Sequence, residues 1–500
     1  MEIKQKKNGE EFVYAVVDFS SPEEIESYAK NLEGMTFREV IELDIAPDGV
    51  SRDYGNKRYK GGMGTLIEER YFGYKANNDA EPDFPEAGVE LKTTCYDVKK
   101  DGNPSAGERL VLTMIPFDRP IEDSLFESHV WEKSSKILLI YYERDKTVEG
   151  YDQVIKHALV FSPPSNDLKI IEDDYNKIRD FVQAGKAEEL SESLTNYLGA
   201  CTKGASEAKM WASQYYPPNT QAKRRAFCFK RQYMDYVLNH YLLGAASDSE
   251  SIITEELTGE ETSFEQYVQK KVAKYSGKTA RELCEIFGIE YTKNKAQWTT
   301  LTNLILGTRG EQAEEFEKAN ISCRTVRVNE SGGLKESLSL HTFEFTEIAN
   351  GQWEESKLFE YLEETRFFFT VFRIRGDEEV LVGSSFWNMP ISDLEGPVRD
   401  CWEEAKRTIN NGVLWEEKID KSGKLSISND LPGSRDNPIA HVRPHASHRA
   451  YQYLDGRVIG NPEKDGSELP DGRWMTKQSF WLNGSYVYEI IQGSFAEDLD

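Results

Sequence analysis

Runs of apolar residues that alternate with polar ones, or continue for several positions, predict strands in both halves of the chain. In the first half these runs are GVELKTT (88–94), RLVLTMIPF (109–117) and SKILLIYYE (135–143), and RFFFTVFRIR (366–375) is a counterpart in the second. Helical patterns accompany them, such as QYMDYVLNHYLL (232–243). This mixture predicts an α/β fold with a central mixed sheet flanked by helices in each half.

The segment GAASDSESIITEELTGEETS (244–263) interrupts these patterns near the middle of the chain. It is rich in Ser, Thr, Glu and small residues and has no clear apolar period, which is typical of a linker. A chain of 500 residues exceeds what one hydrophobic core usually organises. We therefore expect two domains, over residues 1–245 and 263–500, joined by a linker over 246–262.

The two halves share short patterns in the same order, which predicts duplication of one fold. SYAKNLEGMTFREV and KVAKYSGKTARELCEIFG hold Gly, Thr, Arg and Glu at equal spacing, as expected for two helices joined at a Gly turn. DFPEAGVELKTT (83–94) aligns without a gap on EFEKANISCRTV (315–326), and FCFKRQY (227–233) aligns on WMTKQSF (474–480). Two unrelated α/β domains are the alternative.

Composition indicates the cellular compartment and raises an objection to DNA as a ligand. The six cysteines lie far apart without a CxxC pair, and no apolar run reaches about eighteen residues, so we expect a soluble protein of the reducing cytoplasm without a membrane segment. The net charge of −26 argues against DNA as a ligand, because affinity for a polyanion comes largely from Lys and Arg. Local basic clusters decide the field at a binding surface, however.

A candidate metal site lies in the stretch EPDFPEAGVELKTT. Side chains alternate along a strand, so Glu90 and Lys92 project to one face while Val89 and Leu91 enter the core. A bend at PEAG would return Asp83 beside Glu90. Two carboxylates next to a lysine make a site for Mg²⁺, which prefers oxygen ligands and keeps several waters.

Phosphodiester hydrolysis is the chemistry that this set supports. Mg²⁺ lowers the pKa of its water and stabilises charge on the phosphorane, while Lys92 can orient that water or neutralise the scissile phosphate. Asp83 and Glu90 would be ligands, with the Leu91 carbonyl as a third and Glu68, on a predicted helix, as an outer ligand. An acid-x-Lys triplet alone is more often a solvated face in a chain with 30% charged residues.

The second half lacks this set, which provides an internal comparison. In place of Asp83, Glu90, Lys92 and Glu68 the aligned positions hold Glu315, Ser322, Arg324 and Leu306. Loss of metal ligands at two positions predicts that the second half does not cut. The contrast between the copies favours chemistry in the first.

The series KGGMGTLIEERYFG, EPDFPEAGVELKTT, SHVWEKSSKILLI (128–140), YLGACTKGASEAK (197–209) and AFCFKRQY resembles, in order, the MutH-like endonucleases of the PD-(D/E)xK nuclease fold. Two such domains in tandem, with only the first intact, are similar to the two-domain type II restriction enzymes that cut at GATC. The resemblance covers most of the first half. It implies that Glu68, Asp83, Glu90 and Lys92 form the active site and that Lys133 assists near the phosphate.

The resemblance also implies DNA contacts in both halves. Lys203 matches a lysine of a loop that enters the DNA groove, and Cys228 stands where the mismatch-repair members carry a tyrosine, so that base contact differs here. The other implied contacts, in the FKRQ segment, its second-half counterpart and the loop AHVRPHASHRAY, are Lys230, Arg231, Lys477, Arg443 and His445. Basic residues gather in these segments and at Lys57, Arg58, Lys60 and 223–225, which eases the charge objection.

Taken together, these implications predict a Mg²⁺-dependent type II restriction endonuclease that hydrolyses both strands of DNA at GATC within a restriction–modification system. The second domain would bind DNA as an allosteric or effector module. The alternatives are a mismatch-repair-type enzyme that nicks GATC sites and a non-catalytic GATC-binding regulator. A palindromic site favours dimerisation on DNA.

Overall fold

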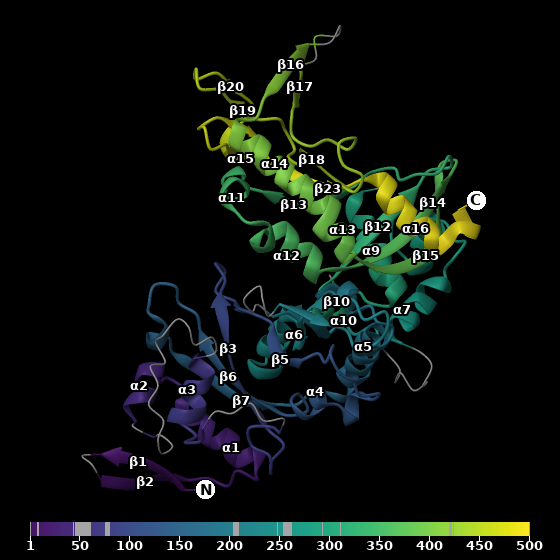
Figure 1. Cartoon of the computed structure of the whole chain (residues 1–500). Helices are drawn as coiled ribbons and strands as arrows, with labels where there is room; N and C mark the ends of the chain where they lie inside the picture. The colour runs from purple at the N-terminus through teal and green to yellow at the C-terminus, as the bar shows by residue number, and fades with distance from the viewer. Residues whose placement is uncertain are drawn as a thin grey trace.

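The structure is a computed structural model that describes residues 2–7, 10–43, 45, 62–75, 81–203, 210–247, 249–253, 263–292, 294–310, 312–419, 423 and 425–499. Figure 1 shows the N-terminal half in the lower part of the molecule and the green and yellow C-terminal half in the upper part, with helices and several sheets in each. The predicted α/β fold class is confirmed. Among the described residues, no helix has the length and apolar character to cross a bilayer.

A hairpin and three helices precede the first large sheet. They are β1 (Glu2–Lys7), β2 (Glu10–Val16), α1 (Pro22–Ala29), α2 (Phe37–Glu42) and α3 (Gly62–Arg70). The helices direct apolar side chains such as Phe37, Leu66 and Ile67 into a core that they share with one face of the sheet. These helices therefore precede the strands of the sheet in the chain.

The first large sheet has the strand order β4-β3-β6-β7. Its strands are β3 (Glu90–Val98), β4 (Pro104–Ala106), β6 (Ile137–Glu143) and β7 (Ile155–Phe161). β3 runs parallel to β6, with Glu90 beside Ile137, and β7 is antiparallel to β6. The apolar run ILLIY explains why β6 is central, because residues 137–141 are all buried, as expected for a strand covered on both faces.

A second, antiparallel sheet completes the first half, in the order β5-β11-β8. Its strands and the surrounding elements are β5 (Leu110–Met114), α4 (His129–Glu132), α5 (Ser165–Gln183), β8 (Leu198–Thr202), β9 (Trp211–Ser213), β10 (Gln221–Lys223), β11 (Arg225–Phe229) and α6 (Arg231–Tyr236), which continues as a π-helix over Val237–Leu242. The helix expected at 232–243 is thus present.

The second half builds sheets with the same connections. Helices α7 (Phe264–Ala273), α8 (Ala280–Phe287), α9 (Lys295–Leu306) and α10 (Glu314–Ala319) lead into β12 (Ile321–Val328), β14 (Arg366–Arg375) and β15 (Glu378–Asn388). β12 is parallel to β14 and β15 is antiparallel to it, as β3, β6 and β7 are. A second sheet has the order β13-β23-β18, formed by Leu338–Phe343, Gln478–Leu482 and Ala440–Pro444.

The remaining elements of the second half surround these sheets. The helices are α11 (Phe345–Asn350), α12 (Lys357–Glu364), α13 (Ile391–Asp393), α14 (Arg399–Asn411), α15 (Pro462–Asp465) and α16 (Gly484–Leu499). The strands are β16 (Trp415–Ile419), β17 (Leu425–Asn429), β19 (Tyr451–Gln452), β20 (Val458–Ile459), β21 (Gly466–Glu468) and β22 (Trp474–Thr476). Figure 1 shows the β16–β17 hairpin projecting from the upper end of the molecule.

Helices α2 and α8 begin in the same way. In each, a threonine side chain accepts a hydrogen bond from the third backbone amide of the helix, and the glutamate at that position accepts one from the threonine amide. The pairs are Thr36 with Glu39 and Thr279 with Glu282, as the repeat in the sequence pairs them. A matching spacing of residues therefore produces a matching local structure.

The glycines two residues earlier also have equivalent positions. Gly34 and Gly277 have φ of +91° and +82°, a conformation that L side chains rarely adopt. Their amides donate to strand carbonyls at 2.8 Å, to Ile155 in the first half and Leu381 in the second. Each Gly turn therefore fastens its helix pair to a strand of the adjacent sheet.

One part of the predicted alignment is wrong. The register of β8 on β11 places Arg225 opposite Thr202, and that of β18 on β23 places Gln478 opposite Pro444. β11 therefore corresponds to β23, which begins after Lys477, and FCFKRQY does not correspond to WMTKQSF. The predicted alignment matches Lys230 with Lys477. The apolar residues of the central strands β11 and β23 give a different register.

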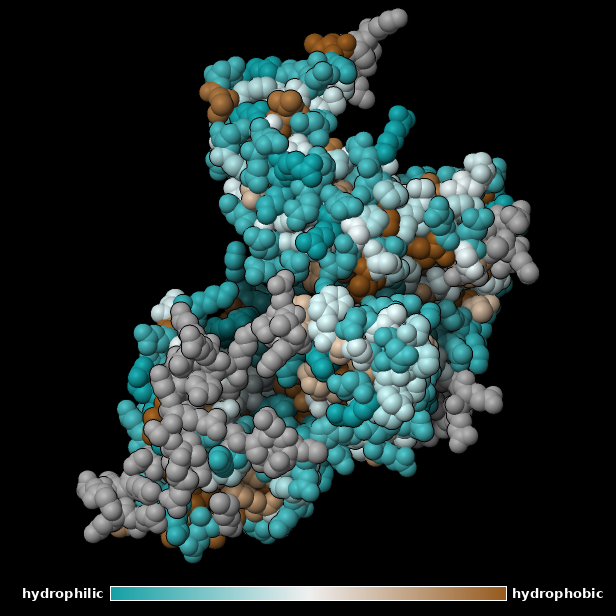
Figure 2. Space-filling model, in the orientation of Figure 1, coloured by the Kyte–Doolittle hydropathy of each residue, from teal (hydrophilic) through white to brown (hydrophobic). Residues whose placement is uncertain are grey.

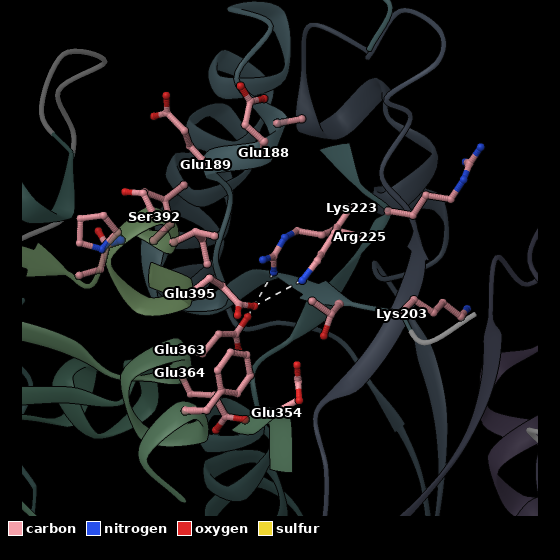
Figure 3. Close-up of a pocket in the computed structure, with 18 of the residues that line it drawn as sticks. Glu188, Glu189, Lys203, Lys223, Arg225, Glu354, Glu363, Glu364, Ser392 and Glu395 are labelled. Atoms are coloured by element: carbon pink, nitrogen blue, oxygen red, sulfur yellow. Dashed lines mark hydrogen bonds and ion pairs between the residues drawn. The ribbon is translucent and has the colours of Figure 1, made fainter. Parts of the chain in front are cut away.

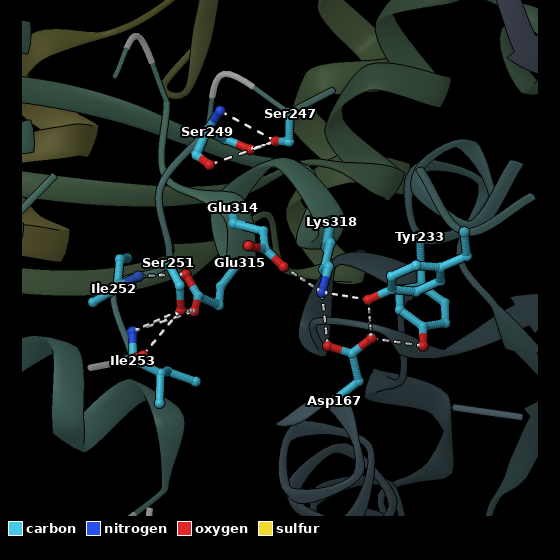
Figure 4. A network of polar contacts seen from close by, with 11 residues as sticks. Asp167, Tyr233, Ser247, Ser249, Ser251, Ile252, Ile253, Glu314, Glu315 and Lys318 are labelled. Carbon is cyan, nitrogen blue, oxygen red and sulfur yellow. Dashed lines mark hydrogen bonds and ion pairs between the residues drawn. The ribbon is translucent and has the colours of Figure 1, made fainter. Parts of the chain in front are cut away.

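Buried polar side chains join the two halves (Figure 4). Lys318 of α10 is buried, and its ammonium donates to Asp167 Oδ1 at 2.8 Å and to the hydroxyl of Tyr241 at 2.9 Å. It also pairs with Glu314 at 2.8 Å and lies 4.5 Å from the ring centre of Tyr236. A continuous apolar core surrounds this network and includes side chains of both halves.

Candidate active site

A tight turn places Asp83 at the start of β3. Phe84 and Val89 pair through backbone hydrogen bonds of 2.9 and 3.2 Å, and residues 85–88 reverse the chain between them, with Gly88 at φ +64°. The Leu91 amide then donates to Asp83 Oδ2 at 2.8 Å. The bend expected at PEAG is therefore present and brings Asp83 to the strand that carries Glu90.

Two lysines hold the buried carboxylate of Glu90. Lys92 Nζ donates to Glu90 Oε1 at 2.6 Å, which shows that these side chains share one face of β3. Lys133 Nζ donates to Glu90 Oε2 at 2.9 Å and to the Glu81 carbonyl at 2.6 Å. Lys133 follows α4 directly, so the short helix delivers its side chain to the end of the sheet just before β6 begins.

Glu68 approaches the same place from helix α3. The helix packs closely on β3, since a side chain at Gly64, one turn before Glu68, would come within 4.0 Å of Thr93 Oγ1. Burial, followed by the charge of Asp83, raises the pKa of Glu68 to about 7. Burial, followed by the charge of Glu90, raises the pKa of Asp83 to about 6, against the lowering effect of the Leu91 amide.

This donor set fits a divalent cation that prefers oxygen ligands. Burial first, and repulsion among the carboxylates second, raise the pKa values of Glu68 and Asp83, and a cation between carboxylates removes such repulsion. The lysines supply positive charge beside Glu90 and are placed to meet an anionic substrate. The site therefore combines carboxylate oxygens with two ammonium groups at one end of the sheet.

Tyr74 belongs to the surroundings of the site, and the sequence analysis missed it. Its amide donates to the Glu68 carbonyl at 3.2 Å, and its ring meets the Phe84 ring edge-on with 5.6 Å between centres. No spacing or motif in the sequence indicates this position, because Gly73 turns the chain back after α3. The residue lies between the helix that carries Glu68 and the turn that carries Asp83.

The corresponding place in the second half has a different structure. Glu315, aligned with Asp83, lies on helix α10 instead of in a turn, and its carboxylate accepts from the amide of Ile252 at 2.8 Å. Arg324, aligned with Lys92, donates to the hydroxyl of Tyr361 at 3.3 Å. Glu315 therefore anchors the segment before the second half.

The implied DNA contacts of the first half fall into two groups. Lys203 is exposed at the end of β8, and Arg231 is partly exposed at the start of α6. Lys230, in contrast, is buried, and its ammonium donates to the carbonyls of Thr195 at 3.2 Å and Ala319 at 3.1 Å. The DNA contact expected at Lys230 does not fit this structure, because its side chain joins the two halves. Lys57, Arg58, Lys60 and 204–209 lie outside the described residues.

A cavity of about 1200 Å³ lies where the halves meet, beside these basic residues (Figure 3). Lys203, Lys223 and Arg224 line it from the first half. The second half contributes a set of carboxylates that we call the acidic wall, formed by Glu354, Glu360, Glu363, Glu364 and Glu395.

Ion pairs cross from the basic residues to the acidic wall. Lys223 pairs with Glu395 at 3.3 Å, and Arg231 pairs with Glu360 at 3.2 Å. Deeper in the interface, Arg225 pairs with Glu363 at 3.2 Å, and both side chains are buried. Part of the basic charge of the first half is therefore neutralised by the second half.

The contacts implied in the second half lie together at the end of β18. The guanidinium of Arg443 covers the Trp481 ring at 4.5 Å, and His445 Nδ1 lies 3.1 Å from Ser479 Oγ. The His445 amide donates to the Lys477 carbonyl at 2.9 Å. Lys203 directly follows Thr202, which pairs with Arg225 at the start of β11, and His445 directly follows Pro444, which pairs with Gln478 at the start of β23. Most of the face shown in Figure 2 is hydrophilic, including the upper part formed by this half.

Comparison with known proteins finds relatives over nearly the whole chain. Residues 72–174 match the family described as DNA mismatch repair enzyme MutH. The chain is 34% identical over 463 residues to the type II restriction enzyme Sau3AI of Staphylococcus aureus, covering 87% of this chain and 93% of that protein. It is 30% identical over 180 residues to the DNA mismatch repair protein MutH of Histophilus somni (strain 2336), covering 35% of this chain and 75% of that protein. The corresponding protein of Pasteurella multocida (strain Pm70) is 25% identical over 226 residues, which are 44% of this chain and 96% of that protein.

Proposed function

The chain belongs to the MutH-like endonuclease family that includes the type II restriction enzyme Sau3AI, and on this basis we propose that it cuts both strands of DNA at 5'-GATC-3'. One observation carries the proposal: Asp83, Glu90 and Lys92 converge at one end of a sheet in a chain that matches a restriction enzyme along most of its length. The GATC sequence comes from the resemblance of the motifs. Mg²⁺ is the proposed cation.

Each residue of the site has a defined role in this proposal. Asp83, Glu90 and the Leu91 carbonyl would hold Mg²⁺, and Glu68 would complete the set from α3. When bound, the ion supplies a Lewis acid that lowers the pKa of water and stabilises charge on the phosphate. Lys92 lies on the face of β3 that meets the scissile phosphate and neutralises its developing charge. Lys133 fixes the orientation of the Glu90 carboxylate through its 2.9 Å contact.

A plasmid assay separates this function from its alternatives. Supercoiled DNA with several GATC sites, incubated with the protein and Mg²⁺ alone, should yield linear fragments. Nicked circles as the sole product would favour the mismatch-repair type of activity. Binding to GATC without any cleavage would favour a non-catalytic regulator.

The Lys92→Ala variant tests the site itself. We expect cleavage to fall by at least about 100-fold, because the phosphate loses a charged partner, while binding to a GATC duplex is retained. Electrophoresis of cleaved plasmid and fluorescence anisotropy measure the two properties. Lys156→Ala is a matched control, since Lys156 forms an exposed ion pair with Glu143 on the same sheet. Cleavage by Lys92→Ala at the wild-type rate would rule out this mechanism.

We also propose that the two halves are copies of one fold, with residues 1–245 as the catalytic copy and 263–500 as the DNA-binding copy. The equal strand connections and the paired Gly turns support this. A matching pair of hydrogen bonds also supports the duplication. The Tyr233 hydroxyl donates to Asp167 at 3.0 Å, and the Tyr486 hydroxyl donates to Asp393 at 2.6 Å. Each bond links the helix after the central strand to a helix beside the sheet.

The second copy binds DNA without cutting it in this proposal. Arg443, His445 and Lys477 form its basic surface, at the place where the first copy has Lys203. Arginine and lysine at such a position contact phosphates and guanine edges. The acidic wall connects the two copies, so DNA on the second copy acts as an effector of the first. Two molecules pair on the palindromic site.

A further inference from the structure

Tyr74 is a polar group that the proposed mechanism does not use. Its phenol oxygen is buried and has no hydrogen-bond partner among the described residues. A buried hydroxyl without a partner costs roughly 1–3 kcal/mol, so such a group beside a candidate active site points to a role in binding or catalysis. The position of Tyr74 defines which partners are within reach.

The ring of Tyr74 is held in one place. It meets Phe84 edge-on at 5.6 Å and Phe72 at 6.5 Å, and both of these side chains are buried. Gly73, at φ +72°, turns the chain after α3, and the Tyr74 amide donates to the Glu68 carbonyl. The ring that carries the hydroxyl is therefore held between the helix of Glu68 and the turn of Asp83.

Asp83 is the acceptor that fits best. It precedes Phe84, on which the Tyr74 ring packs, and it uses Oδ2 for the Leu91 amide. Burial raises the pKa of Tyr74 well above its usual value, and the charge of Asp83 contributes next, ahead of Glu68 and Glu90. A phenol that keeps its proton is a donor at every working pH.

We propose that Tyr74 is a positioning residue of the cation site, whose hydroxyl gains a hydrogen bond to the Asp83 carboxylate when a divalent cation binds and fixes the oxygen that Asp83 presents to that cation. Carboxylates that ligate metals are themselves held by hydrogen bonds, and loss of such a partner typically costs about 10- to 100-fold in metal affinity. The inference rests on the proposed function, because it needs Asp83 to be a metal ligand.

Tyr141 provides a matched control. Its hydroxyl is also buried and without a partner among the described residues, but it lies on the opposite face of the sheet, in the core that excludes Asp83 and Tyr74. Removing either hydroxyl takes away a buried polar atom of the same kind. Only at Tyr74 does the change affect the cation site.

The experiment measures Mn²⁺ binding by calorimetry on the full-length protein without DNA. We expect Tyr74→Phe to weaken binding roughly 10- to 100-fold, Tyr141→Phe to leave it unchanged and Asp83→Asn to weaken it more than either. Wild-type affinity in Tyr74→Phe, with loss in Asp83→Asn, would overturn this inference and keep the proposed function. Wild-type affinity in Asp83→Asn would overturn both.

A second measurement keeps the result independent of folding. The rise in melting temperature on adding saturating Mn²⁺ is compared within each variant, so that a change in the stability of the metal-free protein cancels. Tyr74→Phe should melt no earlier than the wild type without metal, because it loses only an unpaired hydroxyl. It should then gain less from Mn²⁺ than the wild type does. An equal gain would contradict the inference.

Discussion

The three carboxylates of the site differ in how their charge is balanced. Glu90 contacts Lys92 and Lys133, whereas the pKa of Glu68 is raised to about 7 and that of Asp83 to about 6, in both by burial first. Glu68 is therefore about half protonated near pH 7, and Asp83 takes up its proton as the pH falls toward about 6. A cation binds the ionised forms, so protons compete with it for the site.

Metal affinity should consequently fall as the pH falls. Because the raised pKa values lie near 7 and 6, we expect the affinity for Mn²⁺ to be full at about pH 8 and to decrease through both values toward about pH 5. Calorimetry at a series of pH values measures this. Glu68→Gln should remove the part of the decrease near pH 7 and keep the part near pH 6. An affinity that stays constant between about pH 6 and pH 8 would show that neither group is a ligand.

Residue patterns predicted the site unevenly. Alternation along a strand placed Glu90 and Lys92 on one face, and the 2.6 Å contact agrees. Lys133 and Glu90 lie 43 positions apart, so only the resemblance assigned Lys133 to the site, and it did not predict this contact. Tyr74 had no signal of either kind, because a Gly turn and ring packing place it. The burial of Lys230 depends on the other half of the chain, which a local basic cluster cannot show.

At the scale of elements, α10 makes the most specific link between the halves. Its Lys318 reaches Asp167 on α5, and Asp167 also accepts from Tyr233. Burial of a charge is costly unless a partner balances it, so removal of the lysine leaves an uncompensated carboxylate in the interface. Tyrosine hydroxyls alone cannot replace the ammonium.

Lys318→Met should therefore destabilise the protein strongly. We expect a loss of about 3–5 kcal/mol in the free energy of unfolding, from the unpaired Asp167, measured by urea denaturation. Adding Asp167→Asn should restore part of that loss. Lys357→Met is the control, because Lys357 forms an exposed ion pair with Glu347 worth at most about 1 kcal/mol. Equal losses in the two single variants would mean that Lys318 is not a structural link.

Elements with a strong apolar pattern were predicted well. The continuous run of β6 and the long runs of β3 and β14 appear as strands close to the expected bounds. Hairpins such as β1–β2 and β9–β10 were not predicted, because their residues are largely polar or exposed and their pairing partner alone stabilises them. The predicted alignment of the two halves is wrong at β23. It rests on one shared lysine, whereas the pairing of β23 with its neighbouring strands sets the register.

For the whole molecule, the acidic wall and the basic residues opposite it form a contact that the proposed DNA binding would change. In the proposed complex, DNA phosphates and the carboxylates of Glu395 and Glu360 would compete for Lys223 and Arg231. The two pairs are partly exposed, so each contributes at most about 1 kcal/mol. DNA therefore has only a small cost to overcome at each pair.

Neutralising these two glutamates should tighten DNA binding. We expect the double variant Glu395→Gln and Glu360→Gln to bind a GATC duplex about 2- to 5-fold more tightly for each cation released. Fluorescence anisotropy at fixed salt, in the Lys92→Ala background, measures this without cleavage. Glu404→Gln is the control, since Glu404 pairs with the exposed Arg407 on α14. If the double variant binds no better than this control, the acidic wall does not compete with DNA.

The acidic wall also bears on how such an enzyme would find its sites. With a net charge of −26 and part of its basic surface already neutralised, we expect the protein to bind random DNA weakly and to leave it quickly. Sliding over long distances along the duplex requires that a protein bind random DNA tightly and leave it slowly. The search then proceeds by repeated collisions from solution, and the length of DNA that flanks a site has little influence on how soon that site is cut.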